Sequence, residues 1–399
     1  MEVKQWVKIP DVLFFQEGPG VRNSQYTEEG IKLLNVANLV DGKIDLTTSN
    51  RYISESEAYG KYKHFLCDDG DFIVASSGIK VEYINKKMGF VTKSMLPLCM
   101  NTSTIRFKVL DKSRLNIKYF MYYLKSQNFK NQLYKYITGS AQLNFGPSHL
   151  KKIIFPLCDI GEQRIIVNNM DLITKIMDSY NEQLEKYDEL IKARFIEMFG
   201  DPIVNEKGWR TKPLLDMGQC KNGMNFHYDD KGIDINCLGV CDFKNFSVID
   251  NTKGLPTVSL NEMPSEEYLL KDDDIVFVRS NGNKALVGRS LVVYPGNVPT
   301  TFSGFCIRYR KYDNEIIVPY LLRVLKTDSV RMKMAGRGAN IQNLNQQILG
   351  TLVIPVPPIE LQEQFANFVQ QVDKSREEVK KSLEKTQQLY DSLMQEYFG

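Results

Sequence analysis

Two stretches of this chain carry apolar residues at alternating spacings of three and four, which is typical of a helix in a coiled coil. The first runs from Glu162 to Phe199 and contains neither proline nor glycine. The second lies 199 residues later, because the pair Phe199-Gly200 recurs as Phe398-Gly399. The same frame places Arg194 at a seam position near the end of the first helix. The predicted seam residues are Ile166, Met170, Ile173, Met177, Leu184, Ile191, Phe365, Val369, Val372, Val379, Leu383 and Leu393.

Residues at both ends of these stretches predict where the helices begin and end. Pro156 stands ahead of the first and Pro355 to Pro358 ahead of the second, where proline blocks extension backwards. Gly200 and Gly399 follow the last apolar residues, at the position where a left-handed cap is favoured. A helix of about 37 residues is roughly 55 Å long, which exceeds the roughly 30–40 Å diameter of a domain of about 155 residues. We therefore expect the two helices to pair with each other, antiparallel, rather than each to pack only on its own domain.

The repeat extends through the whole chain as a collinear series of matches. The matched pairs are Trp6 and Trp209, Pro10 and Pro213, Asp71 and Asp274, Ile105 and Ile307, Tyr119 and Tyr320, Pro156 and Pro355, and Gln163 and Gln362. Apolar runs predict several strands and then one short helix in each copy, at 117–133 and 318–334. The sequence therefore predicts an α/β protein with a pseudo-two-fold internal repeat, made of globular domains at 1–158 and 201–357 and helical regions at 159–200 and 358–399.

Polar and basic residues gather in the predicted loops of both domains. Arginine pairs with guanine edges, asparagine and glutamine pair with adenine, and lysine and serine bind phosphates. A solvated turn is the plain explanation for any single loop, but the set recurs in both copies and predicts contact with DNA. The candidates are Arg22, Asn23, Ser76, Ser77, Lys80, Lys86, Gln142 and Asn144 in the first domain, and Lys221, Asn222, Arg279, Ser280, Asn281, Lys284, Arg289, Arg337, Asn340 and Gln342 in the second.

Composition restricts these predictions only slightly. The 399 residues carry a net charge of +3, so a surface for nucleic acid has to be a local patch. The chain has no apolar run near the roughly 18 residues of a membrane span and no signal-peptide pattern at its start, so we expect a cytoplasmic protein. Its 7 cysteines are scattered and only 3 histidines accompany them, which predicts reduced cysteines acting as small hydrophobic residues rather than a metal site.

Motifs that carry catalysis are not found in the sequence. It has no nucleotide P-loop, no GxGxxG after a strand, no Asn-Pro-Pro-aromatic run, no HExxH and no GxSxG. The acidic runs Asp68 to Asp71 and Asp272 to Asp274 precede predicted strands in the same way, so a turn explains both. We therefore predict that this chain is not an enzyme.

The layout resembles the DNA specificity subunit of type I restriction-modification systems, in which two target recognition domains alternate with two long helical regions. The resemblance covers the entire chain. It rests on the Trp-to-Pro module starts, the strands GDFIVASSG and DDIVFVRSNG, the Gly-x-x-Gln-x-Asn-like turn at 139–144, the segments PLCDIGEQ and PVPPIELQEQ, and Phe199-Gly200-Asp201-Pro202 after the central helix. The first helix entry lacks the Pro-x-Pro-Pro form of the second.

The resemblance implies that each recognition domain reads one half of a split, asymmetric DNA sequence, and that the helix pair fixes the gap between the halves. It also implies that the helices dock two modification (methyltransferase) subunits, which restriction subunits join. S-adenosylmethionine, ATP and magnesium are expected on those partners, with no cofactor or metal in this chain. Two other interpretations stay open: a stand-alone DNA-modifying enzyme with an unfamiliar motif, and a structural coiled-coil adaptor.

Overall fold

The structure is a computed structural model that describes residues 5–136, 143–226, 232–244, 247–335 and 343–399. It divides into two compact units, Met1–Asn181 with Lys380–Gly399 (unit 1) and Glu182–Val379 (unit 2). Each long helix therefore contributes one part to each unit.

Unit 1 is built on an antiparallel sheet in which the strands follow the order β2, β11, β7, β9, called here its central sheet. Phe72, Ile73, Val74 and Ala75 of β7 are all buried, because helices or loops cover both faces of this strand. The strands of unit 1 are β1 (Gln5–Lys8), β2 (Leu13–Glu17), β3 (Ile31–Leu34), β4 (Leu39–Val40), β5 (Lys43–Ile44), β6 (Tyr52–Ile53), β7 (Phe72–Ala75), β8 (Ser77–Ile79), β9 (Met88–Phe90), β10 (Leu98–Met100), β11 (Thr104–Val109), β12 (Leu143–Asn144) and β13 (Ile154–Leu157).

Unit 2 repeats this plan. Its central sheet has the order β15, β22, β19, β20, β17, with the last pair parallel and the others antiparallel. A smaller sheet also recurs: β3 runs parallel to β10 in unit 1, as β16 does to β21 in unit 2. The strands of unit 2 are β14 (Thr211–Pro213), β15 (Gly218–Asn222), β16 (Ile233–Leu238), β17 (Val248–Ile249), β18 (Thr257–Leu260), β19 (Asp274–Val278), β20 (Ser290–Val293), β21 (Thr300–Phe302), β22 (Cys306–Lys311) and β23 (Val353–Pro355).

The single short helix predicted in each copy is two helices in the structure. The break falls at Ser126 in unit 1 and at Thr327 in unit 2, both in an extended conformation. Their hydroxyls stabilise it, since Ser126 Oγ accepts from the Phe129 N–H at 3.2 Å and Thr327 Oγ1 donates to the Val324 carbonyl at 2.7 Å. The shorter helices are α1 (Glu55–Tyr59), α2 (Ile117–Lys125), α3 (Gln127–Tyr136), α4 (Pro147–Leu150), α6 (Val318–Lys326), α7 (Asp328–Ala335) and α8 (Gln346–Gly350).

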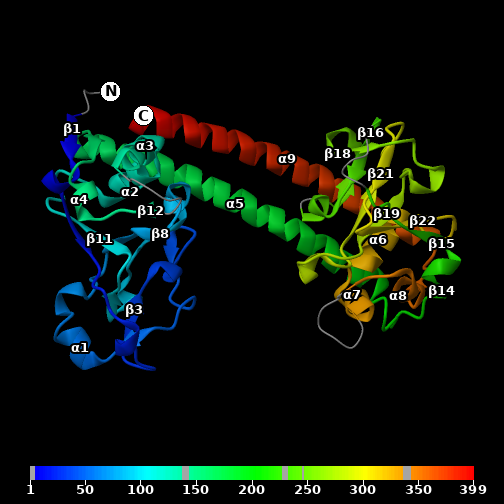
Figure 1. Ribbon diagram of the computed structural model, residues 1–399, viewed down its shortest axis with the longest axis horizontal. Coiled ribbons are helices and arrows are strands. Elements are labelled where there is room, and N and C mark those ends of the chain that lie inside the picture. Colours follow the sequence, from blue (N-terminus) through cyan, green and yellow to red (C-terminus); the bar gives the residue numbers. More distant parts are fainter. Residues whose placement is uncertain (1–4, 137–142, 227–231, 245–246, 336–342) are drawn as a thin grey trace. The chain divides into compact units, whose positions relative to one another are not determined.

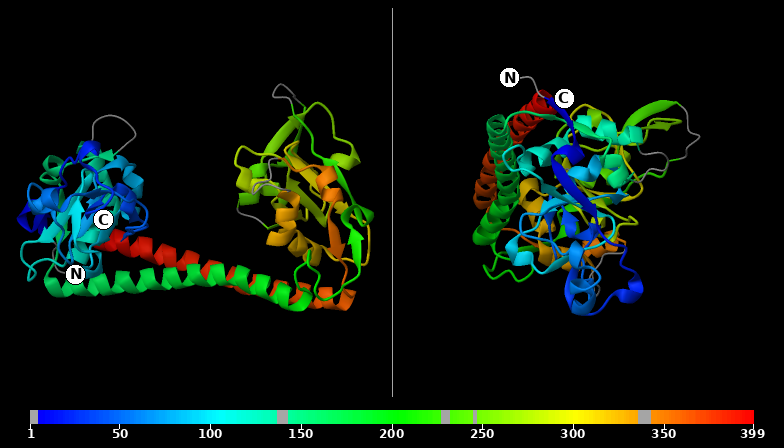
Figure 2. Two further views of the ribbon diagram at one scale, coloured as in Figure 1. Left: turned by 90° about the horizontal axis from the view of Figure 1, so that it is seen from below. Right: turned by 90° about the vertical axis from the view of Figure 1, so that its left-hand side faces the viewer.

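The long helices are α5 (Ile160–Phe199) and α9 (Ile359–Phe398), each of 40 residues. In the views of Figures 1 and 2 they lie along one side of the strands of each unit. α5 begins slightly earlier than predicted, because Asp159 Oδ1 accepts hydrogen bonds from the N–H groups of Gly161 and Glu162 at 2.7 and 3.1 Å. The predicted left-handed glycine after α5 is confirmed, with φ +76° at Gly200.

Within each unit the two long helices run antiparallel. In unit 1 the early residue Asn169 of α5 donates to the late residue Tyr397 of α9, at 3.3 Å. In unit 2 the late residue Phe195 of α5 packs on the early residue Phe365 of α9, with 5.5 Å between ring centroids. The predicted antiparallel pairing is confirmed, and the helix ends are also part of each unit's hydrophobic core.

The predicted seam residues all face the interior to some degree. Near the unit cores Ile166, Met170, Ile173, Ile191, Phe365 and Val372 are buried, and Met177, Leu184, Val369, Val379, Leu383 and Leu393 are half-buried. The frame drifts at the end of α5, where Phe195 is fully buried and Arg194 lies half-exposed over the ring of Phe368. A straight helix of 3.6 residues per turn moves about 20° per heptad away from a 3.5-residue pattern, which accounts for the shift.

Each long helix ends in the aromatic core of the unit opposite to the one in which it begins. The ring of Phe199, at the end of α5, packs on Tyr320 of unit 2 with 4.7 Å between centroids. The ring of Phe398, at the end of α9, packs on Tyr119 of unit 1 with 5.0 Å between centroids. Each long helix thus begins in one unit and ends in the core of the other, and the recurring Phe-Gly pair lies at these two equivalent ends.

Among the residues that the structure describes, no helix combines the length and the apolar character needed to cross a membrane.

Candidate nucleic-acid interface

The predicted contact segments of unit 1 start from one end of its central sheet. Glu17, the last residue of β2, pairs with Ile105, and Ala75, the last residue of β7, pairs with Thr104. β2 and β7 therefore finish beside the start of β11. We call this end of the sheet, and its counterpart in unit 2, the loop edge. Arg22 and Asn23 lie in the segment that leaves β2 there.

The loop edge of unit 1 brings two predicted segments together. After β7 the chain enters β8, which pairs with β12 so that Ser77 lies opposite Asn144. The N–H of Phe145 donates to the carbonyl of Ser76 at 2.9 Å. Lys80 follows β8, and Lys86 precedes β9 at the same end, where the N–H of Ala75 donates to the Lys87 carbonyl at 2.8 Å.

Unit 2 has the same arrangement at its own loop edge. Asn222, the last residue of β15, pairs with Ile307, and Val278, the last residue of β19, pairs with Cys306. The segment 279–289 then leaves β19 and returns, and the N–H of Val278 donates to the Arg289 carbonyl at 2.9 Å. It carries the predicted residues Arg279, Ser280, Asn281, Lys284 and Arg289.

A second contact at this edge matches the one in unit 1. The N–H of Leu344 donates to the Arg279 carbonyl at 2.8 Å, as Phe145 does to Ser76. The scaffold thus recurs with different side chains on it, because Arg279 takes the place of Ser76. Two loop edges of one geometry and different chemistry suit two different ligand surfaces.

The accessibility of the predicted residues varies. Ser76 is fully buried and its hydroxyl has no hydrogen-bond partner among the described residues, so its side chain is not at the surface in this structure. The sequence pattern could not distinguish it from Ser77, because neighbouring residues of a strand point to opposite faces. Arg22, Asn23, Lys80, Lys86, Lys284 and Arg289 are exposed, and Ser77, Lys221, Asn222, Arg279, Ser280 and Asn281 are half-buried.

Two of the predicted lysines already have acidic partners. Lys221 Nζ lies 2.7 Å from a Glu267 carboxylate oxygen and 4.5 Å from the ring centroid of Tyr268. The hydrogen bond to Glu267 raises the pKa of Lys221. Lys86 lies 3.8 Å from Asp41, and both are exposed. These lysines have to exchange partners to bind a phosphate, whereas Lys284 and Arg289 have no ion pair within the described residues. Gln142, Arg337, Asn340 and Gln342 lie outside the described residues, as does the side chain of Asn144.

Buried ion pairs stabilise each central sheet near the end away from the loop edge, where β7 and β19 begin. In unit 1 the guanidinium of Arg106 on β11 lies 3.2 Å from the Asp71 carboxylate and donates to Gln16 on β2 at 2.5 Å. In unit 2 the partner of Asp274 is Arg310, which donates to both carboxylate oxygens at 2.8 and 2.7 Å. The same carboxylates accept backbone N–H groups in the turns before β7 and β19, as the acidic runs predicted. The sequence pattern indicated the two aspartates, but it did not indicate their partners, Arg106 and Arg310.

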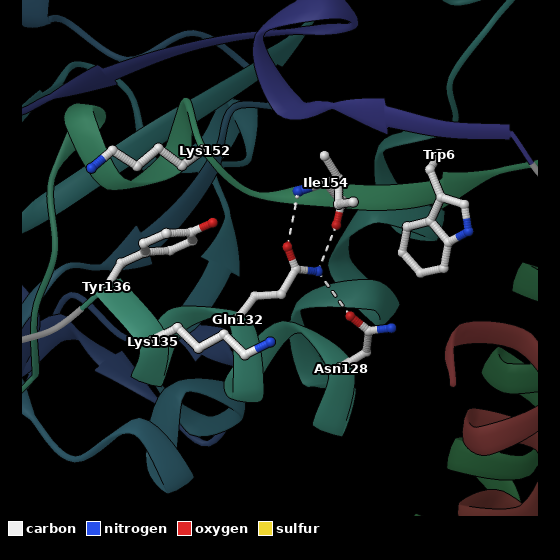
Figure 3. Close-up of a pocket in the computed structure, with 7 residues that line it drawn as sticks. All are labelled: Trp6, Asn128, Gln132, Lys135, Tyr136, Lys152 and Ile154. Atoms are coloured by element: carbon white, nitrogen blue, oxygen red, sulfur yellow. Dashed lines mark hydrogen bonds between the residues drawn. The ribbon is translucent and has the colours of Figure 1, made fainter.

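A hollow of about 430 Å³ opens in unit 1 at the last turns of α3. The amide of Gln132, one of the lining residues, accepts from the N–H of Ile154 at 3.0 Å and donates to its carbonyl at 2.7 Å. Lys152 Nζ lies 5.5 Å from the ring centroid of Tyr136. Figure 3 shows the lining residues Trp6, Asn128, Gln132, Lys135, Tyr136, Lys152 and Ile154.

Its aromatic and lysine side chains are of the kinds that contact bases and phosphates. The residue of the sequence pattern that lines this hollow is Trp6, which is 47% exposed. The counterpart of Trp6 in the repeat, Trp209, instead donates to the Phe199 carbonyl at 3.0 Å.

No cluster of three acidic, histidine or cysteine side chains suited to a metal ion occurs within the described ranges. The cysteines there are all free, and burial raises the pKa of Cys67 and of Cys237 to about 12.

Comparison with known proteins decides the family. A family model described as the type I restriction modification DNA specificity domain matches residues 8–186 and again residues 206–388. The chain belongs to this family. Its two copies of the specificity domain are the two halves of the internal repeat.

Relatives within the type I specificity family cover nearly all of the chain. The StySPI specificity subunit of Salmonella potsdam is 23% identical over 396 residues, 93% of this chain and 82% of the relative. The putative MjaX specificity subunit of Methanocaldococcus jannaschii is 21% identical over 392 residues, 90% of this chain and 86% of the relative. The function that goes with this family is recognition of DNA sequence by a restriction-modification system.

Solved structures of the family share the fold. The S subunit from M. genitalium aligns with a TM-score of 0.53 at 17% identity, covering 100% of this chain and 97% of that one. A chain from a structure on complex assembly and conformational transition of the type I R-M system aligns with a TM-score of 0.61 at 15% identity, covering 100% and 98%.

Proposed function

We propose that this specificity protein reads a bipartite, asymmetric DNA sequence, with the loop edge of each unit contacting one half. The observation that carries the proposal is the recurrence of one loop-edge geometry with different exposed side chains, Lys80 and Lys86 in unit 1 and Lys284 and Arg289 in unit 2. A shared scaffold presents both segments to DNA in the same way, and different side chains select different bases.

The long helices have two further roles in this proposal. A helix of 40 residues is about 60 Å long, more than one DNA turn of about 34 Å, so the pair can set the spacing between the half-sites. The helices also dock two modification subunits. An exposed apolar stripe on α5 supports docking: Ile165, Leu172 and Ile176 are 62, 59 and 37% exposed at helical spacing.

The chemistry of the system is proposed to reside on the partner subunits. S-adenosylmethionine belongs to the modification subunits, and ATP and magnesium to the restriction subunits. This chain then contributes recognition and assembly, without catalysis. Incubation of the purified chain with DNA, S-adenosylmethionine and magnesium is expected to give no methylation or cleavage. A methylated or cut product would contradict this part of the proposal.

Exchange of one domain tests the bipartite reading. Residues 201–357 are replaced by the corresponding segment of another family member, and the methylated sequence is determined by methylome sequencing. The expected result is a changed half-site beside an unchanged one. A matched replacement of residues 1–158 should change the other half. If either replacement changes both halves or neither, the assignment of one unit to each half is wrong.

A further inference from the structure

Unit 2 contains a pocket of about 90 Å³ between α6 and the adjoining parts of α5 and α9. Its apolar wall includes Leu322, Phe365 and Val369. Its charged side chains are three cations, Arg323, Lys326 and Arg376, and two acids, Asp188 and Asp373. We call it the cationic pocket. Arg323 and Lys326 are one helical turn apart on α6, so they share the face that meets the long helices.

The cations of this pocket are incompletely paired. Within the described residues Arg323 and Lys326 have no ion pair and no side-chain hydrogen bond, and the buried Nε of Arg323 has no partner. Arg376 contacts Asp188 at 2.5 Å and Asp373 at 3.4 Å, yet its own Nε is buried without a partner. Half-buried donors without acceptors destabilise a protein unless a ligand supplies the acceptors.

Burial and, to a smaller degree, the neighbouring arginines act on the lysine of the pocket. Burial and then the neighbouring Arg323 lower the pKa of Lys326 from 10.5 to about 8. Asp188 and Asp373 act in the opposite direction and do not compensate. The lining holds three cations against two acids, and the acids contact Arg376, so an anion placed beside Arg323 and Lys326 is favoured electrostatically.

The equivalent place in unit 1 lacks this excess of charge. Lys125 corresponds to Lys326, but Tyr122 stands where Arg323 is, and Met177 where Arg376 is. Lys125 Nζ lies over the ring of Tyr122, 4.9 Å from its centroid. The repeat therefore places a lysine there twice and adds two arginines in unit 2 only, which points to a ligand of unit 2.

The form of the pocket favours a protein carboxylate over a DNA phosphate. A phosphodiester is flanked by hydrated sugars, which leave an apolar wall uncovered. A protein segment can place a carboxylate on the arginines and an apolar neighbour against Leu322 and Val369. A carboxylate also matches the planar guanidinium geometry of two arginines.

We propose that the cationic pocket receives an aspartate or glutamate, flanked by an apolar residue, from the protein that docks on the helix pair. This inference rests on the docking role proposed above, under which that protein is the modification subunit. The bound carboxylate would neutralise Arg323 and Lys326 and hold the partner against α6 and α9.

Zero-length cross-linking of the assembled complex tests the proposal, because a carbodiimide joins the Lys326 amine to a carboxylate only in direct contact. The full-length chain and the purified modification subunit are assembled, treated, digested and analysed by mass spectrometry. The expected product links Lys326 to one aspartate or glutamate of the partner. Lys326→Arg should assemble normally and lose this product, since it keeps the charge and removes the amine.

Charge reversal provides the second measurement. Arg323→Glu combined with Lys326→Glu should weaken assembly at least ten-fold, whereas Lys374→Glu, an exposed residue of α9, should change it less than two-fold. Thermal melts of each variant establish that it is folded. If the double variant does not fold, the cross-link and its loss in Lys326→Arg decide alone.

Failure of the inference and failure of the docking role are distinguishable. If the wild-type complex assembles but Lys326 links only to Asp188 or Asp373 of its own chain, the inference is wrong and docking stands. If DNA alone protects Lys326 from acetylation, a phosphate occupies the pocket and the inference is again wrong. If the wild-type chain does not assemble with the modification subunit, the docking role is wrong, and the inference with it.

Discussion

The ring of Phe398 packs on that of Tyr119, with 5.0 Å between centroids, and joins the last turn of α9 to α2 in unit 1. Phe199 and Tyr320 form the matching contact in unit 2, at 4.7 Å. Each unit therefore needs the end of a helix that begins in the other unit, which couples the two halves of the repeat.

This contact predicts a large loss of stability in Phe398→Ala. Phe398 is fully buried, and truncation of such a ring costs about 3–5 kcal/mol through lost burial and a residual cavity. The free energy of unfolding is measured by urea denaturation. Leu389→Ala is the control on the same helix, because Leu389 is 51% exposed and should change stability by about 0.5 kcal/mol or less. Equal effects of the two would refute the exchange of helix ends as a stabilising feature.

Gln163 predicts a second loss, from hydrogen bonding. Its buried amide accepts from the Asn116 N–H and donates to the carbonyls of Arg114 and Cys158, each at 2.8 Å. Gln163→Leu leaves these backbone groups unpaired, and we expect a cost of about 2–4 kcal/mol by chemical denaturation. Gln183→Leu, exposed on the same helix, should be nearly neutral. A loss below about 1 kcal/mol at Gln163 would mean that water replaces the amide.

Loss of charge at the loop edge should reduce the salt dependence of DNA binding. Lys284→Gln and Arg289→Gln each remove an exposed cation, and each lost phosphate contact lowers the slope of log K against log salt by about 0.9. Fluorescence anisotropy of the assembled complex on its target duplex measures that slope. Lys271→Gln should leave it unchanged, because this exposed residue precedes β19 at the end away from the loop edge. If all three variants give the same slope as the wild type, Lys284 and Arg289 do not contact DNA.

Lys326→Met should stabilise the free protein at neutral pH. The folded-state pKa, about 8, lies below the ordinary 10.5, so the unfolded state binds more protons between these values. The destabilisation by Lys326 is therefore complete below pH 8 and diminishes as pH rises towards 10.5. The stability difference between variant and wild type should narrow over that range in melts at a series of pH values.

Buried tyrosines lower the stability of the folded protein above pH 10, since burial raises the pKa of Tyr309 and of Tyr320. They occur in both variant and wild type, so they do not alter the stability difference between the two. Lys374→Met provides an exposed control. A difference that does not vary with pH would contradict the lowered pKa of Lys326.

The fold class, the repeat and the long helices could all be predicted from the sequence. Residues three and four positions apart decide a helix face, so the seam from Ile166 to Leu393 is visible in the pattern itself. The same holds for Asp71 and Asp274, whose turns involve only neighbouring residues. The break at Ser126 was not predicted, because its apolar flanks fit one continuous helix.

The sequence predicted that the candidate contact residues lie in loops. Only the tertiary structure shows that these loops lie together on one surface. Residues 76–80 and 143–144 meet because β8 pairs with β12, and the pattern of neither segment encodes that register. The burial of Ser76 and the partial exposure of Ser77 depend on this register as well.

By itself the sequence determined what this protein is made of: two copies of one domain, two heptad helices, and the family to which they belong. These are encoded locally or by comparison of one half with the other. Tertiary structure alone decided that each helix ends in the other unit's core, that the candidate loops share one sheet edge, and that Arg323, Lys326 and Arg376 face one pocket. Such contacts join residues far apart in the chain, and their geometry follows from side-chain packing that no local period specifies.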